Sequence, residues 1–212
     1  MGVRIVSTVV TAVDSYDLTT LAVVKDELSI TGGASDGTLR RYITSASAAA
    51  AQYCNRVFQV ETVRDEFWPD RDCSPVFGGL DVLQLSRWPV ESVATLTESG
   101  AELGEDIDFR VEPKTGQVIR LDAAGNARRW GTCPIVAQYD AGYPTVPADV
   151  ADAVTRMVTK RFSAKGRDAS LRSESIPGVR DVTYWIATGA EAGNLTPDVA
   201  DVLDNYRIPV MA

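Results

Sequence analysis

The sequence predicts an α+β protein, a small helical bundle (about four helices) with an inserted antiparallel β module between the second and third helices. Two observations predict it: apolar residues recur at helical spacing toward both ends of the chain, and short β-branched runs separated by turn residues fill the middle. We expect an N-terminal arm and two bundle helices in residues 1–56 and the β module in residues 57–143. Residues 144–212 are expected to supply the remaining helices, a loop and a tail that complete the bundle.

The N-terminal stretch, residues 5–13, is rich in Val, Ile and Thr. These side chains lose rotamer freedom in helices and fit pleated strands, so the stretch predicts an extended arm or an edge strand. A first helix follows with Thr19 or Thr20 as its N-cap, and the pair Gly32–Gly33 is expected to end it.

The second helix is predicted from a cap at Ser35 or Asp36 to about Cys54, because its apolar residues fall on one stripe. Its alanine-rich span, Ser45–Ala51, leaves room for another backbone to approach closely, which suggests tight helix pairing. The high helix propensity of alanine is the alternative explanation.

The middle of the chain predicts several short strands joined by turns rich in Gly, Pro, Asp and Asn. Their spacing suits a small antiparallel sheet or barrel. The expected strands are Phe58–Phe67, Val82–Ser86, Ser92–Thr97, Asp108–Val111, Gln117–Leu121 and Ile135–Tyr139.

Helical spacing returns in the C-terminal third of the chain. The third helix is expected to begin with Pro147 as its first residue and to end before Gly166. The charged stretch 167–176 predicts a loop, and Val179–Ile186 predicts a short strand. A fourth helix is expected from a cap at Thr196.

Several classes of catalytic site are excluded by composition. The chain contains no histidine, which removes Ser-His-Asp and Cys-His systems and HExxH zinc sites. It also lacks the glycine-rich loops that cradle phosphates in nucleotide-binding proteins. The cysteines Cys54, Cys73 and Cys133 are odd in number and widely spaced, and we interpret them as reduced thiols. We therefore expect no enzyme activity, no cofactor and no metal site.

Carboxylates cluster at Asp65–Glu66, at Asp70 with Asp72, and along Glu102–Asp108. A hard cation uses such groups, but none of the clusters has the spacing of an EF-hand loop with its glycine and closing glutamate. We interpret them as solvated turns between strands.

The chain is acidic, with 21 Lys and Arg against 29 Asp and Glu and a formal net charge of -8. Such a field repels phosphate backbones and anionic lipid, although solubility alone is a sufficient reason for it. No apolar run approaches the ~18 residues that a membrane helix needs, so we expect a soluble protein made in the host cytoplasm.

Several segments, in their order and spacing, resemble the phage head-to-tail connector families of the gp6-like and phiE125 gp8-like kind. The junction into the third helix is similar to their Y-x-A-G-Y…V-P-x-D pattern, and Arg87–Val93 is similar to their strand-turn segment. The junction comprises Val136–Tyr143 and Val146–Val150, and the other matching segments are Val3–Val6, Leu21–Leu28, Tyr53–Phe58, Ser173–Tyr184 and Leu203–Pro209.

The resemblance implies a structural adaptor subunit in the neck of a tailed bacteriophage virion. It implies a homo-oligomeric ring, a dodecamer where it matches the portal, that lies under the portal protein and extends the DNA channel toward the tail. The implied partners are the portal protein and tail stopper or tail terminator proteins, with DNA only as passing cargo and no membrane. We further expect acidic side chains to face the channel, because they repel DNA that must slide past.

The C-terminal segment is the candidate partner-binding site, because a free tail of this composition leaves apolar surface exposed. A frayed terminus is the alternative. The candidate residues are Tyr184, Trp185, Tyr206, Arg207, Ile208, Pro209 and Val210.

Two other functions compete with an assembly role. The β module, residues 57–143, could act alone as a carbohydrate-binding or protein-binding module. A histidine-free hydrolase that uses paired carboxylates is the other alternative.

Overall fold

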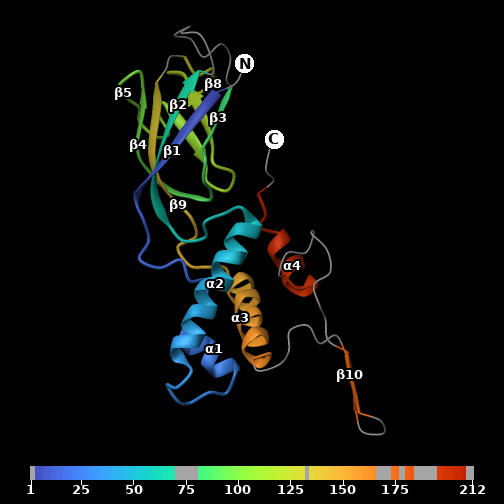
Figure 1. Cartoon of the computed structure of the whole chain (residues 1–212). Coiled ribbons are helices and arrows are strands. Elements are labelled where there is room, and N and C mark those ends of the chain that lie inside the picture. The colour runs from blue at the N-terminus through green and yellow to red at the C-terminus, as the bar shows by residue number, and fades with distance from the viewer. Residues whose placement is uncertain are drawn as a thin grey trace. The chain divides into compact units, whose positions relative to one another are not determined.

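The computed structural model describes residues 3–69, 81–131, 134–165, 173–176, 180–183 and 195–208 (Figure 1). The chain forms two compact units, each built from two separate stretches. Met1–Ser15 and Val57–Thr145 form a β unit, and Tyr16–Arg56 and Val146–Ala212 form a helical unit. The described residues contain four helices, with antiparallel sheets between the second and third, so the predicted α+β class is confirmed.

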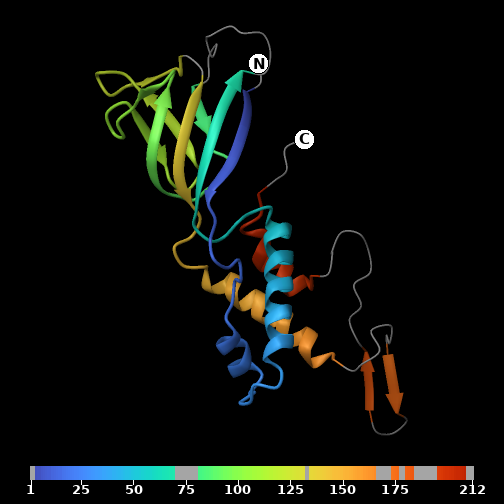
Figure 2. The ribbon, with the colours of Figure 1, turned by 60° about the vertical axis from the view of Figure 1, so that its left-hand side comes forward.

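The first sheet of the β unit is antiparallel throughout, and Figure 2 shows its long strands side by side. Along the two central strands, β2 and β9, buried side chains alternate with more exposed ones, as expected of a sheet with one face on a core, whereas the side chains of β1 from Arg4 to Thr11 are exposed. In spatial order the strands are β1 (Val3–Thr11), β2 (Glu61–Pro69), β9 (Ile135–Ala141), β4 (Val90–Glu98) and β5 (Ala101–Glu102).

A second, smaller antiparallel sheet completes the β unit. Its strands are β3 (Val82–Gln84), β7 (Gln117–Leu121) and β6 (Phe109–Glu112), with β8 (Ala127–Arg128) paired to β7. Both sheets contribute to one hydrophobic core. Its largest side chains are Phe67, Leu83, Leu96, Phe109, Trp130, Ile135 and Tyr139.

The N-terminal arm is the edge strand of the first sheet. It pairs with β2 from Val3 opposite Pro69 to Thr11 opposite Thr62, with a bulge near Val10. The arm was expected together with the helices of residues 1–56, but the strand with which it pairs is β2 of the β unit. A strand paired in this way belongs to the sheet, whatever its position in the sequence.

The helical unit consists of α1 (Leu21–Glu27), α2 (Asp36–Cys54), α3 (Ala148–Ser163) and α4 (Pro197–Asp204). None of the described helices is both long enough and apolar enough to cross a bilayer. The buried core of the unit comes from all four helices and the segments beside them. Its members include Leu18, Val24, Leu39, Ile43, Ala50, Val150, Val154, Val158, Val199 and Leu203.

Two helix boundaries differ from those predicted. The first helix ends at Glu27 rather than at Gly32–Gly33, because Ser29 adopts a left-handed backbone with φ of 55° that stops the helical hydrogen bonds. Pro147 is the N-cap of the third helix rather than its first residue, since its ψ of 134° is not helical.

The prediction of a loop at residues 167–176 is wrong for its last four residues, 173–176. Residues Ser173–Ile176 form β10, which pairs with β11 (Arg180–Thr183) as an antiparallel hairpin. The hairpin confirms the central part of the strand predicted at Val179–Ile186, and the remainder of that prediction lies outside the described residues.

Candidate functional site

The C-terminal segment, residues 205–208, follows α4 and lies against the end of α2 and the start of α3. The Tyr206 hydroxyl donates to the carboxylate of Asp149, with both oxygens at 2.9 Å. The Arg207 guanidinium lies 5.2 Å from the ring centroid of Tyr53. The backbone N–H of Ile208 donates to the carbonyl of Cys54 at 2.9 Å. The segment therefore satisfies one of the carbonyls that a helix C-terminus leaves unpaired.

Two further bonds connect α2 with α4 at this place. The Tyr53 hydroxyl donates to Asp204 Oδ1 at 2.7 Å, and this carboxylate, chiefly through that bond, raises the pKa of the tyrosine. The Cys54 thiol lies 3.5 Å from the carbonyl of Leu203, and burial raises the pKa of the thiol to about 11. The thiol stays protonated at neutral pH, which makes Cys54 a packing residue and not a nucleophile.

The structure brings together only some of the predicted site residues. Tyr206 and Ile208 are half-buried against their own helical unit, and Arg207 is exposed beside them. The other candidates lie outside the described residues, namely Tyr184, Trp185, Pro209 and Val210. The three described residues hold the chain at the end of α2 before its last four residues, 209–212.

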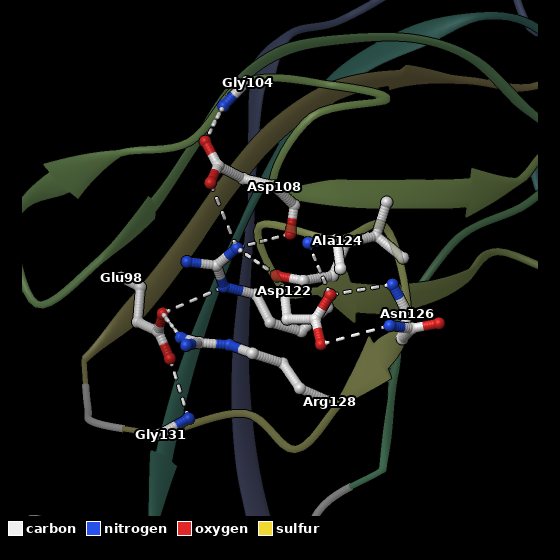
Figure 3. A network of polar contacts seen from close by, with 10 residues as sticks. Glu98, Gly104, Asp108, Asp122, Ala124, Asn126, Arg128 and Gly131 are labelled. Carbon is white, nitrogen blue, oxygen red and sulfur yellow. Dashed lines mark hydrogen bonds and ion pairs between the residues drawn. The ribbon is translucent and has the colours of Figure 1, made fainter.

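A buried ion pair joins the two sheets of the β unit (Figure 3). The Nε of Arg120 in β7 lies 3.1 Å from Oε2 of Glu98 in β4, and both side chains are only 9% exposed. The other carboxylate oxygen of Glu98 accepts from the backbone N–H of Gly131 at 2.7 Å. Arg120 Nη1 also donates to the backbone carbonyls of Asp108 and Leu121. These bonds compensate the loss of hydration that burial imposes on both charges.

The network continues to the surface through two loops (Figure 3). Asp108 accepts from the N–H of Gly104 at 3.0 Å and lies 3.4 Å from Arg120, and chiefly the first bond lowers its pKa. Asp122 accepts from the N–H groups of Ala124 and Asn126 at 2.9 Å each. Backbone donation, from Asn126 first, lowers the pKa of Asp122, so its carboxylate holds the 122–126 turn.

An open hollow of about 650 Å³ lies between these loops. Ile107 stands at its margin with 74% of its surface exposed. The charged groups that line the hollow already have partners: Asp106 pairs with Arg110 at 3.2 Å, and Arg128 with Glu98 at 3.6 Å. Because these charged side chains are already in ion pairs, we interpret the hollow as a consequence of loop packing rather than as a site for a charged ligand.

A second buried carboxylate, Asp65, fixes the segment after β3. It accepts from the backbone N–H and the hydroxyl of Ser86 at 2.8 and 2.7 Å, and from the Tyr139 hydroxyl at 2.7 Å. Burial raises the pKa of Tyr139, with the Asp65 charge as a further cause. The adjacent Arg87 forms an ion pair with the buried Glu61. Both carboxylates are thus occupied as acceptors within the fold.

Where the structure describes them, the acidic clusters seen in the sequence do not meet as a metal site. Among the described residues, no group of three or more Cys, Asp or Glu side chains is arranged to hold an ion. Asp70 and Asp72 lie outside the described residues. In the 102–108 stretch, Asp106 pairs with Arg110 and Asp108 pairs with Arg120.

Sequence reasoning missed two features of the β unit. One is the Glu98–Arg120 pair, for which the only signal is a charged residue inside the apolar run Val118–Leu121. The other is the partner of the predicted edge strand: the structure confirms β1 at the edge of the first sheet and pairs it with β2, with Ile5, Val6, Val9 and Val10 exposed. A sequence cannot tell on which side an edge strand is paired.

Comparisons with known proteins identify relatives of the fold. No protein-family model matches the chain, and no curated protein matches it. A chain in the neck of the empty gene transfer agent (GTA) particle, computed with C6 symmetry, aligns with a TM-score of 0.56 and 19% identity over 97% of both chains. A chain in the virion of the native GTA particle aligns with a TM-score of 0.55 and 18% identity, again over 97% of both. A chain in the neck of the native particle, computed with C12 symmetry, aligns with a TM-score of 0.54 and 16% identity over 97% of both chains. At these identities the likeness shows a shared fold over nearly the full length.

Proposed function

We propose that this chain is a structural subunit of the neck of a phage-like particle, an adaptor that forms a ring under the portal and extends the DNA channel toward the tail. The observation that carries the proposal is the fold match, which covers 97% of this chain and 97% of a chain found in a particle neck. Both units of the chain take part in a match of that extent. The C12 symmetry of one such neck supports a ring of twelve copies.

The chemistry of the described residues supports a structural role over a catalytic one. Two buried carboxylates of the β unit, Asp65 and Glu98, accept hydrogen bonds that join strands and loops. The described thiol, Cys54, is buried and protonated. These groups stabilise a rigid subunit, which suits a part that must hold its shape in an assembly.

The proposed portal-binding or tail-binding residues are at the C-terminal end, with Tyr206, Arg207 and Ile208 as its fixed base. Their bonds to Asp149 and Cys54 hold Tyr206 and Ile208 against the helical unit, directly before residues 209–212 in the sequence. An apolar peptide held at a fixed place loses less conformational entropy on binding than a free tail does. In this proposal the ring contacts its neighbours in the particle through these last residues and through Tyr184 and Trp185.

Electron microscopy and light scattering of the purified full chain test the ring. We expect ring-shaped particles of about 275 kDa, twelve times the 22.9 kDa of one chain, either alone or after mixing with the portal protein of the same particle. A chain that stays monomeric at every concentration, and also with the portal protein present, would contradict the proposal.

A truncation tests the C-terminal residues. Removing residues 209–212 keeps the Ile208–Cys54 bond, so we expect the thermal unfolding of the chain to stay unchanged while portal binding is lost. Removing 207–212 is the comparison, because it also deletes Arg207 and Ile208 with the bond to Cys54 and should lower stability. Equal portal binding by all three chains would exclude this segment as the contact.

A further inference from the structure

The outer edge of β1 is an open strand edge. Among the described residues, only β2 pairs with β1, so the alternate N–H and C=O groups on its other side have no strand beside them. The strand runs for nine residues, Val3–Thr11, and Arg4 is its one charged residue. Val6 and Val10 are 40% and 51% exposed. Long apolar edges of this kind template pairing with another strand.

The opposite edge of the same sheet is more strongly protected than β1, whose one bulge lies near the end of the strand, between Val9 and Thr11. The backbone N–H of Val90 donates to the carbonyl of Pro113 at 2.8 Å, and the carbonyl of Leu96 accepts from Leu103 at 2.9 Å. Two register irregularities also interrupt β4 between these residues. Bulges and covered ends prevent strand addition, so the sheet offers β1 as its one long pairing edge within the described part.

The sequence of β1 is complementary to itself in the antiparallel direction. A pairing centred on Ser7 places Ile5 opposite Val9 of the other copy and Val6 opposite Thr8. Between Ile5 and Val9, before the bulge of β1, the two strands keep their faces, because odd residues meet odd residues and even meet even. Whichever alternate set of backbone groups points outward in this span, the register sets each N–H opposite a carbonyl.

Charge and area also fit a second copy. The one charged side chain of the strand, Arg4, lies opposite Val10 of the partner strand in this register, so no like charges face each other. Apolar side chains that are now exposed pack across the new strand pair. A single strand pair buries on the order of 1,000 Å² or less, below the ~1,200–2,000 Å² of stable interfaces, so the contact should be weak.

We propose that the free chain dimerises by antiparallel pairing of β1 with β1 of a second copy, which joins two five-stranded sheets into one. This two-fold contact uses the same edge on both copies, whereas the contacts of a closed cyclic ring join different surfaces. The dimer is therefore a state of the unassembled chain, separate from the proposed neck ring. It covers an aggregation-prone edge until assembly.

Sedimentation of the full chain across a concentration series tests the pairing. We expect the wild-type chain to dimerise with a Kd of about micromolar or weaker. Val6→Lys should raise this Kd by about tenfold or more, because a lysine at an edge strand opposes strand pairing. Val82→Lys is the matched control, because Val82 is 37% exposed in β3 of the other sheet, and it should leave the dimer unchanged. Circular dichroism checks that both variants fold.

A compensating substitution tests the register. Thr8→Glu alone should weaken the dimer, but chains carrying Val6→Lys should pair with chains carrying Thr8→Glu more tightly than either pairs with itself. Oxidative cross-linking of Ser7→Cys gives a second readout, since the two residues at position 7 meet at the two-fold axis; Val82→Cys is its control.

Three results would overturn the proposal: a wild-type chain that shows no dimer at millimolar concentration, a Val6→Lys chain that dimerises like wild type, or a dimer without Lys–Glu compensation. Rings that form with Val6→Lys as they do with wild type would leave the proposed neck function intact. Loss of rings in the wild-type chain would count against that function and not against the dimer.

Discussion

Replacing Arg120 by methionine removes the cation that joins the two sheets of the β unit and keeps most of its aliphatic volume. Glu98 then remains buried beside β7 with its hydration lost. It keeps the Gly131 N–H at 2.7 Å and the more distant Arg128 at 3.6 Å. The carbonyls of Asp108 and Leu121 each lose the bond from Arg120 in the same change, and the carbonyl of Asp108 keeps the backbone N–H of Leu121 at 2.7 Å.

Breaking a buried ion pair from one side costs about 3–5 kcal/mol. Because Glu98 keeps the Gly131 N–H and Arg128, we expect the loss of unfolding free energy to lie near the lower end of this range, at about 3 kcal/mol. Arg128→Met is the control, because that side chain is 47% exposed, and it should cost about 1 kcal/mol or less. Replacing both Glu98 and Arg120 by methionine should cost less than Arg120→Met alone, since no buried charge is then left without its partner.

Urea unfolding followed by tryptophan fluorescence measures these differences. Trp130 is fully buried and lies 6.0 Å from the Arg120 guanidinium, so its emission reports on the β unit. A loss for Arg120→Met no larger than that for Arg128→Met would refute the reasoning. So would a double variant less stable than the single one.

Three other predictions concern the remaining contacts. Gly142→Ala should cost about 3 kcal/mol in urea unfolding, because a Cβ there would lie 2.2 Å from a backbone oxygen and the φ of 138° strains any side chain; an unchanged midpoint would refute it. Tyr206→Phe removes the hydrogen bonds to Asp149, so it should lower the free energy of unfolding by about 1 kcal/mol in thermal unfolding and speed amide exchange after α4. Tyr42→Phe is the control, because its ring keeps the contact with the Arg161 guanidinium at 4.2 Å, and it should change neither quantity. Cys54 should resist alkylation at pH 8, since a pKa of about 11 leaves about a hundredfold less thiolate than an ordinary cysteine has, and peptide mapping should find it modified only in urea.

Helices and strands with strong local patterns could be predicted from the sequence. The second helix matches its predicted span because a capping region, one apolar stripe and an αL residue at Asn55 agree. The glycine of the Ala-Gly-Tyr junction, Gly142, stood out as part of a family pattern, and the structure gives the reason. A side chain there would collide with the backbone of Gln59.

Features that depend on distant residues could not be predicted in the same way. The two-residue strands β5 and β8 carry too few residues for a periodic signal. The pairing of β1 with β2 joins residues about sixty positions apart, and no local pattern specifies that partner. The C-terminal segment was expected to be a partner-binding tail or a frayed end. Its contact with Asp149 depends on where two helices meet.

The pairing of β1 with β2 also means that neither unit corresponds to a continuous piece of the gene. The first sheet cannot close until both of its stretches, Met1–Ser15 and Val57–Thr145, have been synthesised. The helical unit likewise cannot fold until its second stretch, which begins at Val146, has been made. Deleting 57–145 to isolate the helices would leave an unpaired apolar strand at the N-terminus, which invites aggregation. A fragment meant to carry the helical unit alone therefore has to begin after Ser15, with a short linker replacing the excised strands.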